Sequence, residues 1–208
     1  LEFRRVLFRS IGTVTRLLAN RLGSPFTYAT YSRSKKMAPG QLDWKEMRDL
    51  YRYSDIDEAT ELFGVVADPV AHSYSPLIHN SAFLKDNFNA RYFPFRVPKN
   101  DLRDFVKKGR SIGVHGLSVT IPHKEEALRV CTQAESSASG IGAVNTLIFD
   151  GEDVLGYNTD YRAAMDCIEE LFKIDRQQER PMQGITALVL GAGGVSRAVA
   201  WEIGRAHV

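Results

Sequence analysis

Between Leu62 and about Ile174, short strand-like runs alternate with helical patterns. Strands joined by helical crossovers pair in parallel, because a parallel pair needs a connection of about a dozen residues or more. The alternation therefore predicts an α/β domain with a mainly parallel sheet, in which ligands bind beyond the carboxyl ends of the strands. The strand-like runs are Leu62–Val66, Arg91–Val97 and Val114–Ile121, and the helical patterns begin at Ser75, Asp101 and Lys124.

The second half of this region predicts a β-hairpin followed by a helix. Val144–Phe149 and Val154–Tyr157 carry apolar and β-branched residues on either side of Asp150-Gly151, a dipeptide typical of hairpin turns. After Asp160, apolar residues recur at helical spacing, and we expect that helix to bury one face. The residues expected on the buried face are Met165, Ile168, Leu171 and Phe172.

Polar side chains gather where the predicted strands end and beside the predicted hairpin. Singly, each has an ordinary structural explanation: Ser75 and Asp160 fit helix N-caps, and Lys124 fits a solvated charge. Together they predict a polar binding site, because paired hydroxyls can bind a carboxylate and a lysine beside an aspartate can transfer a proton. The clusters are His72–Ser75, Thr120–Lys124, Asn145–Thr146 and Asn158–Asp160.

The remaining reactive residues suggest no metal or redox chemistry. The two cysteines, Cys131 and Cys167, lack a metal-ligand or redox spacing, and we interpret them as buried small hydrophobes in a reducing compartment. No apolar run approaches the roughly 18 residues that a membrane span needs, so we expect no membrane partner. We also predict no metal site, because metal-ligand spacing is missing among the histidines His72, His79, His115 and His123.

The two ends of the sequence look foreign to the rest. Residues 6–10 and 202–208 can be encoded by DNA with reverse-complementary stretches, as in translated sequencing adapters. We therefore expect 1–10 and 202–208 to be artefacts outside the fold. When Arg5, Arg9, Arg205 and Glu202 are removed, the 27 basic and 25 acidic residues both fall to 24, and the net charge of +2 becomes zero. A neutral chain gives no indication of a nucleic-acid partner.

A glycine-rich turn near the carboxyl end has the pattern of a dinucleotide-binding fingerprint. It follows the apolar strand-like run Ile185–Leu190 and precedes a helical pattern. Such glycines let the backbone approach a pyrophosphate at the N-terminus of a helix. Ser196 departs from the usual third glycine or alanine of this pattern. The predicted cofactor-binding residues are Gly191, Ala192, Gly193, Gly194 and Ser196.

Four stretches resemble the signature motifs of shikimate dehydrogenases, in the same order and at similar spacing. They are Asp68–Asn80, Ser118–Glu125, Ile141–Thr146 and Gly156–Asp160. The resemblance implies a substrate-binding domain at 62–174 and the start of a truncated Rossmann NADP-binding domain at 184–201. The implied reaction is the NADPH-dependent reduction of 3-dehydroshikimate to shikimate, a step of chorismate and aromatic amino-acid biosynthesis.

The same resemblance implies a role for each polar residue. NADP is implied by the family alone, because the residue that selects between NAD and NADP lies about 20 residues beyond the glycine turn. With so little of the nucleotide-binding domain, the 208-residue chain itself is expected to be inactive. The implied roles are carboxylate binding for Ser73 and Ser75, contacts to ring hydroxyls and the reacting oxygen for Thr120, Asn145 and Asp160, and acid/base catalysis for Lys124 and Asp160.

Residues 11–53 resemble the C-terminal end of type I 3-dehydroquinate dehydratase, a (β/α)8 barrel whose site lies at the carboxyl ends of its strands. This resemblance implies that Arg16 and Gln41 bind the dehydratase substrate. Met37 replaces a serine usual in that family, which leaves open whether the dehydratase is active. The matching stretches are Gly12–Arg16, Gly23–Ala29 and Ala38–Gln41.

Together the two resemblances imply a fused dehydratase and dehydrogenase that acts on a small-molecule substrate. The implied location is the cytoplasm, or the plastid in a plant or alga. Two alternatives stay open: a quinate dehydrogenase, and a non-catalytic homologue that binds pathway metabolites as a regulator. Ser75 and Thr120 are the residue types of the shikimate enzymes, and the presence of Lys124 and Asp160 favours catalysis over regulation.

Overall fold

The computed structural model describes residues 12–38 and 40–172, with scattered positions between 186 and 203. The chain forms two compact units, Leu1–His123 and Lys124–Val208, and each is described by itself. The α/β class and the mainly parallel pairing predicted from the sequence are confirmed. The unit boundary falls inside the segment predicted as one domain, 62–174, and the predicted domain limits stay predictions.

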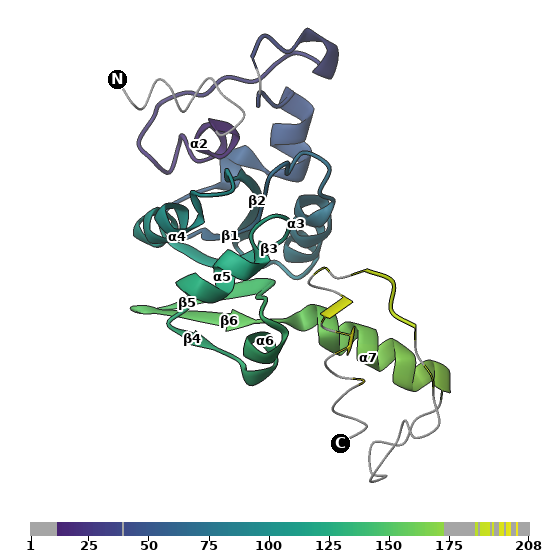
Figure 1. Cartoon of the computed structure of the whole chain (residues 1–208). Helices are drawn as coiled ribbons and strands as arrows, with labels where there is room; N and C mark the ends of the chain where they lie inside the picture. The colour runs from purple at the N-terminus through teal and green to yellow at the C-terminus, as the bar shows by residue number, and fades with distance from the viewer. Residues whose placement is uncertain are drawn as a thin grey trace. The chain divides into compact units, whose positions relative to one another are not determined.

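A parallel sheet forms the centre of unit 1 (Figure 1). Strand β1 (Glu61–Ala67) pairs on one side with β2 (Ala90–Arg96) and on the other with β3 (Val114–Val119). β1 is rich in buried apolar residues, as expected for a strand covered on both faces. Pro94 in β2 has no N–H to donate to a neighbouring strand, which suits β2 because it lies at the edge of the sheet.

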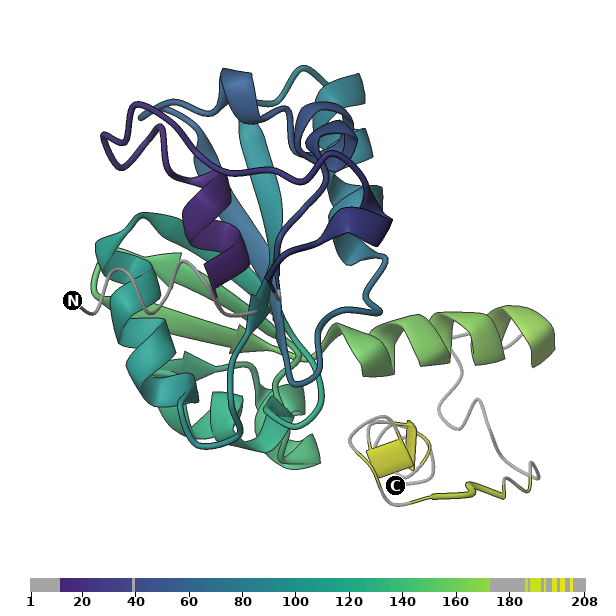
Figure 2. The same cartoon turned by 90° about the horizontal axis from the view of Figure 1, so that it is seen from above.

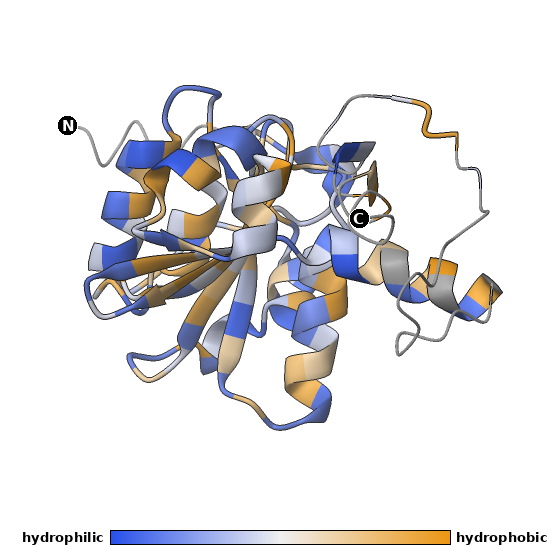
Figure 3. Ribbon diagram, turned by 60° about the horizontal axis from the view of Figure 1, so that its bottom comes forward, coloured by the Kyte–Doolittle hydropathy of each residue, from blue (hydrophilic) through white to orange (hydrophobic). Residues whose placement is uncertain are grey.

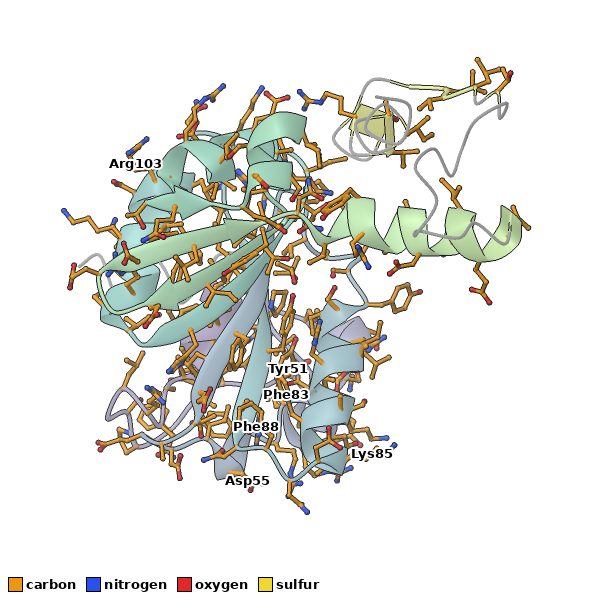
Figure 4. The ribbon with its side chains drawn as sticks, turned by 90° about the horizontal axis from the view of Figure 1, so that it is seen from below. Tyr51, Asp55, Phe83, Lys85, Phe88 and Arg103 are labelled. Carbon is orange, nitrogen blue, oxygen red and sulfur yellow. The ribbon has the colours of Figure 1, made fainter. Side chains whose placement is uncertain are left out.

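Two helices cover opposite faces of this sheet. His79 of α3 (Ser75–Lys85) stacks on Tyr92, with 4.2 Å between ring centroids. Phe105 of α4 (Leu102–Ser111) packs on Phe95, with centroids 5.0 Å apart. Tyr92 and Phe95 are three residues apart on one strand, so their side chains leave opposite faces. Figure 4 shows Phe83 and Phe88 at the far end of α3, where their rings meet edge to face at 5.5 Å.

The start of α3 differs from the prediction. Ser75 is the first residue of the helix, and Tyr74 occupies the N-cap position that we predicted for Ser75. The hydroxyl of Ser73 accepts the backbone N–H of Ser75 at 3.3 Å, so the preceding serine makes the local bond that a cap would make.

The segment before β1 joins the core of unit 1. The ring of Tyr51 stacks parallel to Phe93 at 5.9 Å, and the Arg91 side chain donates to the Tyr51 carbonyl at 2.8 Å. Leu17 and Ile56 are fully buried. The elements of this segment are short: α2 (Thr13–Leu17), η2 (Arg33–Lys35), η3 (Glu46–Leu50) and η4 (Tyr53–Asp55).

Unit 2 contains the predicted hairpin, because β5 (Thr146–Asp150) pairs antiparallel with β6 (Asp153–Tyr157). A two-residue strand, β4 (Gln133–Ala134), pairs in parallel with β6. Position 156 of β6 has room only for a glycine, because an added Cβ would lie 2.4 Å from the Cys131 sulfur. The helices of unit 2 are α5 (Lys124–Val130), α6 (Ser136–Ile141) and α7 (Thr159–Phe172).

The helix α7 corrects two predictions. Leu171 is 76% exposed rather than buried, and Cys167 is exposed rather than a buried hydrophobe. Figure 2 shows α7 as a long straight helix, and Figure 3 shows apolar residues along its far half. The helical spacing predicted an apolar face correctly, but within the described residues nothing covers that face near its end. Ile168 is half-buried, and the side chains of Met165 and Phe172 lie outside the described residues.

Within the described residues, no helix is both long and apolar enough to cross a membrane. The same residues contain no group of three or more histidine, cysteine and acidic side chains arranged to hold a metal ion. The predicted artefact 1–10 lies outside the described residues, and of 202–208 the structure describes only Ile203.

Candidate functional site

A lysine–aspartate pair is the central polar feature of unit 2. Lys124 is the first residue of α5, and Asp160 is the second residue of α7. The Nζ atom of Lys124 donates to Oδ2 of Asp160 at 2.5 Å. The two side chains are 18% and 30% exposed, so the pair is shielded from water yet reachable by a ligand. Such a pair can hold a proton donor in a fixed position.

Asn158 leaves the Asp160 carboxylate available for this pair. Its Oδ1 accepts the backbone N–H of Asp160 at 3.2 Å, the bond expected of a helix N-cap residue. Its Nδ2 donates to the Ala143 carbonyl at 2.8 Å, which fixes the side chain in the interior. The ordinary explanation that the sequence offered for Asp160, an N-cap, is therefore wrong, because Asn158 fills that position.

Asn145 belongs to the same cluster. Its Nδ2 donates to Thr159 Oγ1 at 3.0 Å, and its Oδ1 accepts the Thr159 backbone N–H at 3.0 Å. The preceding residue, Val144, donates its N–H to the Lys124 carbonyl at 2.9 Å. The structure thus brings Lys124, Asn145 and Asp160 together where α5 and α7 begin. An amide nitrogen carries two N–H groups, so Asn145 keeps one for a ligand.

Three further predicted residues lie at the carboxyl edge of the unit 1 sheet. Ser73 and Ser75 are half-buried in the segment that follows β1. Thr120 follows β3, and its backbone N–H donates to the Val66 carbonyl of β1 at 3.1 Å. The edge beyond the carboxyl ends of parallel strands is where ligands bind in such sheets.

His123, the residue before Lys124, is completely buried. Its Nε2 lies 2.8 Å from the Val97 carbonyl, and because a carbonyl only accepts, we assign the proton to Nε2. The backbone N–H of His123 donates to the Thr120 carbonyl at 2.9 Å. These two bonds fix the turn between Thr120 and His123. The sequence could not indicate this role, because the Val97 carbonyl that His123 contacts is 26 residues away.

A cavity of about 530 Å³ in unit 1 joins segments that the sequence treated separately. Gln41, predicted for the dehydratase, and Ser73, predicted for the dehydrogenase, both line it. Arg96 lines it as well and pairs with Asp68 at 2.8 Å. No sequence signal could have revealed this cavity, because it depends on how the segment before β1 packs.

Arg16 and Gln41 bind the backbone of their own segment. Arg16 is buried, which lowers the pKa of its guanidinium, and its Nη1 donates to the Gly40 carbonyl at 3.0 Å. Gln41 Oε1 accepts the N–H groups of Met37 and Ala38 at 2.9 and 3.2 Å. The side chain of Met37, which replaces the expected serine, is 91% exposed.

The described part of the glycine turn fits a sharp bend before a helix. Gly191 has a φ of 121°, a conformation that favours glycine, and an added Cβ would lie 3.1 Å from Ser196 Oγ. The N–H of Arg197 donates to the Gly193 carbonyl at 3.0 Å. Sequence reasoning missed Arg197, whose guanidinium pairs with Glu125 at 2.7 Å. The other predicted cofactor residues, Ala192 and Gly194, lie outside the described residues.

Comparison with protein families gives two matches along the chain. Residues 65–147 match the substrate-binding domain of shikimate dehydrogenase. Residues 8–58 match type I 3-dehydroquinase.

Individual relatives show the same order of segments. Over 198 residues, the chain is 36% identical to the chloroplastic bifunctional 3-dehydroquinate dehydratase/shikimate dehydrogenase of Arabidopsis thaliana. This match covers 91% of this chain and 32% of the relative. It is 40% identical over 153 residues to the NADP(+) shikimate dehydrogenase of Caldanaerobacter subterraneus, with 74% and 52% of the two chains covered. The chain thus spans about half or less of these relatives.

A solved structure of shikimate 5-dehydrogenase from Thermus thermophilus, in complex with NADP(H) and shikimate, has a similar fold. The TM-score is 0.60 at 34% identity, over 71% of this chain and 53% of the other. The chain therefore joins a segment of the type I 3-dehydroquinase family to the substrate-binding domain of the shikimate dehydrogenase family.

Proposed function

We propose that the protein containing this chain is a bifunctional enzyme whose dehydrogenase part reduces 3-dehydroshikimate to shikimate with NADPH. The observation that carries this proposal is the shielded pair of Lys124 and Asp160, joined at 2.5 Å. Lys124 stands at the N-terminus of α5, where a cation is disfavoured, and the Asp160 carboxylate balances its charge. The match to the shikimate dehydrogenase substrate-binding domain supports the same assignment.

In this proposal Lys124 is the proton donor. The reacting ketone oxygen gains negative charge as hydride arrives at its carbon, and a nearby ammonium stabilises that charge. Lys124 then transfers a proton to the oxygen, and Asp160 holds the ammonium in the geometry that this transfer requires. In the reverse direction the same pair accepts the proton.

The remaining polar residues bind the substrate in this proposal. Ser73 and Ser75 donate to its carboxylate, whose charge does not change during the reaction. Thr120 and Asn145 bind ring hydroxyls, and the spare N–H of Asn145 is suited to a hydroxyl acceptor. Groups that meet unchanging parts of the substrate contribute equally to ground state and transition state, so they act on KM.

The glycine turn would hold the pyrophosphate of NADP. The positive φ of Gly191 and the helix that follows are features of such turns, and the residues described there fit the cofactor. When bound, the nicotinamide supplies the hydride. The names of relatives as NADP(+) enzymes, and the NADP(H) complex of the Thermus relative, support NADP rather than NAD.

The dehydratase segment and the location of the protein complete the proposal. The order of the two family matches is that of the Arabidopsis bifunctional relative, which supports a dehydratase upstream of the dehydrogenase. That relative is named as chloroplastic, which supports a plastid location if the protein is from a plant or alga. Otherwise we propose the cytoplasm.

The test uses the full-length protein that contains this chain. Oxidation of NADPH with 3-dehydroshikimate is measured as the loss of NADPH absorbance. Reduction of NADP is measured with shikimate and with quinate as substrates. We expect turnover of shikimate to exceed that of quinate by at least about tenfold, the discrimination that one well-placed contact supplies. A protein that binds shikimate but turns over neither substrate would instead be a regulator, and one that prefers quinate would be a quinate dehydrogenase.

A further inference from the structure

A second cavity, of about 200 Å³, lies in unit 1 where α3 ends and β2 begins, and part of the segment before β1 completes its wall. Asp55, Phe83 and Phe88 line it, and Figure 4 shows them at the same end of unit 1. The predicted substrate residues Ser73 and Thr120 instead follow β1 and β3, at the carboxyl edge of the sheet. This cavity is therefore separate from the predicted substrate residues, and we call it the Arg91 cavity.

Arg91, the second residue of β2, brings a positive charge to this cavity. The residue is only 8% exposed, and burial lowers the pKa of its guanidinium. Its Nε donates to the Tyr51 carbonyl at 2.8 Å, and its Nη1 donates to the Ala90 carbonyl at 2.7 Å. No aspartate or glutamate of the described residues forms an ion pair with it. A buried charge usually has a partner of opposite charge, and the described residues leave that place open at Arg91.

The guanidinium of Arg91 keeps N–H groups for a ligand. It carries five N–H groups, and the two bonds to backbone carbonyls leave three of them. Nη2 has no hydrogen bond within the part of the chain that the structure describes, yet it is not a fully buried atom. Because Arg91 lines the cavity, we place the accessible surface of Nη2 there. These N–H groups can accordingly donate to a molecule inside the cavity.

The other charged residues of the lining do not neutralise Arg91. Arg52 and Asp55 line the cavity as an ion pair, with 2.7 Å between Nε and Oδ2. Two arginines and one aspartate give the lining a net charge of +1. Asp57, the next acidic residue along the chain, does not line the cavity, and its carboxylate accepts a hydrogen bond from Thr60. The lining therefore suits a molecule that carries one negative charge.

Apolar side chains from the end of α3 and the turn after it supply another part of the wall. Leu84 and Phe88 line the cavity and are 48% and 43% exposed. Phe83 lines it as well, and its ring meets that of Phe88 edge to face. An apolar group inside the cavity would remove part of this surface from water, which favours binding.

We propose that the Arg91 cavity binds a small organic monocarboxylate with an apolar body. The carboxylate accepts the remaining N–H groups of Arg91, and the apolar body packs against Phe83, Leu84 and Phe88. Arginine is suited to this role because its planar N–H groups can meet both oxygens of a carboxylate. A dianion such as phosphate is disfavoured, since it would exceed the charge of the lining and approach Asp55. The volume of the cavity limits the ligand to about the size of a single ring.

The experiment is a calorimetric titration of the full-length protein with benzoate, a monocarboxylate of this size. We expect a Kd on the order of 1 mM, as is usual for so small a ligand. Benzamide, which has the same ring without the charge, and inorganic phosphate should each bind at least about tenfold more weakly. Saturating shikimate should leave the Kd of benzoate within about twofold, because the predicted substrate residues lie at the other edge of the sheet.

Two substitutions locate the site. Arg91→Met removes the charge and should weaken benzoate at least about tenfold, whereas Lys85→Met removes an exposed charge of α3 outside the lining and should have no effect. Arg91 also holds the Tyr51 carbonyl, so its replacement can lower the melting temperature.

Leu84→Glu provides a test that keeps Arg91. The change brings a carboxylate of the protein itself to the cavity, and benzoate should bind at least about tenfold more weakly without a fall in melting temperature. Ala82→Glu is the matched control, because it adds the same charge at an exposed position of α3 that does not line the cavity. It should leave the Kd of benzoate within about twofold.

Three results would overturn the site. They are displacement of benzoate by shikimate, binding of benzamide as tight as that of benzoate, and an unchanged Kd in folded Leu84→Glu. The proposed function is tested separately. A protein that binds benzoate but does not reduce 3-dehydroshikimate would contradict that function alone, and an active enzyme that does not bind benzoate would contradict the Arg91 cavity alone.

Discussion

The motif residues of unit 2 and those of the segment before β1 use their polar groups in opposite ways. Lys124 and Asp160 face each other as side chains, and the bonds that fix them come from neighbouring residues. Arg16 and Gln41 instead bind backbone groups between positions 37 and 41. The first arrangement leaves charge for a ligand, whereas the second consumes polar groups in holding a loop. Substitutions should therefore affect catalysis in one region and local stability in the other.

The largest effect is expected from Lys124→Ala in the full-length enzyme. If the lysine acts mainly in the transition state, kcat should fall on the order of 100-fold or more, with a much smaller change in KM. Steady-state kinetics with 3-dehydroshikimate measure both. Lys108→Ala is the matched control, because Lys108 is an exposed lysine that also pairs with an aspartate. A normal kcat with only a raised KM would reduce Lys124 to a binding residue and weaken the contrast between the regions.

A smaller effect is expected from Asp160→Asn. Asparagine keeps the size of the side chain but removes the charge that holds the ammonium, so we expect kcat to fall about tenfold or more. The same change at Asp166, in an exposed pair with Arg162 on the same helix, should leave kcat unaltered. Equal effects of the two substitutions would mean that the α7 charges act through helix stability rather than at the site.

In the segment before β1, Gln41→Ala should cost stability without affecting reduction. The change leaves the N–H groups of Met37 and Ala38 without their acceptor, at a cost of about 1 kcal/mol because the site is partly exposed. Thermal unfolding of the chain measures this, and kcat of the dehydrogenase in the full-length enzyme should stay within about twofold. A large loss of dehydrogenase activity would contradict the separation of roles and point to the cavity shared by Gln41 and Ser73.

The smallest effect concerns the cysteines, which differ within unit 2. Burial raises the pKa of the Cys131 thiol to about 11, and its sulfur donates to the Ala127 carbonyl at 3.0 Å, whereas Cys167 is exposed. The thiolate is the reactive form, so at about pH 8 a disulfide reagent should modify Cys167 at least about tenfold faster. A Cys167→Ser variant should then react slowly until it is unfolded. Fast modification of Cys131 would show that unit 2 opens readily around β6.

Much of the local structure was predictable because it depends on short-range chemistry. The hairpin at Asp150-Gly151 and the helix that begins at Lys124 agree with their patterns. Gln133–Ala134 was missed, since two residues are too few for periodicity to register. The apolar spacing after Asp160 predicted a helix correctly but could not reveal that Leu171 would lie exposed, because burial depends on what packs against the helix.

The sequence by itself determined most of the strand and helix order, the parallel pairing, the family and the chemical types gathered at the site. These follow from periodicity, turn residues and motif spacing, which act over a few residues. Only the tertiary structure decided that Asn158 caps α7 and frees Asp160, and that Arg16 and Gln41 bind backbone groups of their own segment. Each of these depends on which partner a polar group meets across the fold, and burial leaves it few partners to choose from.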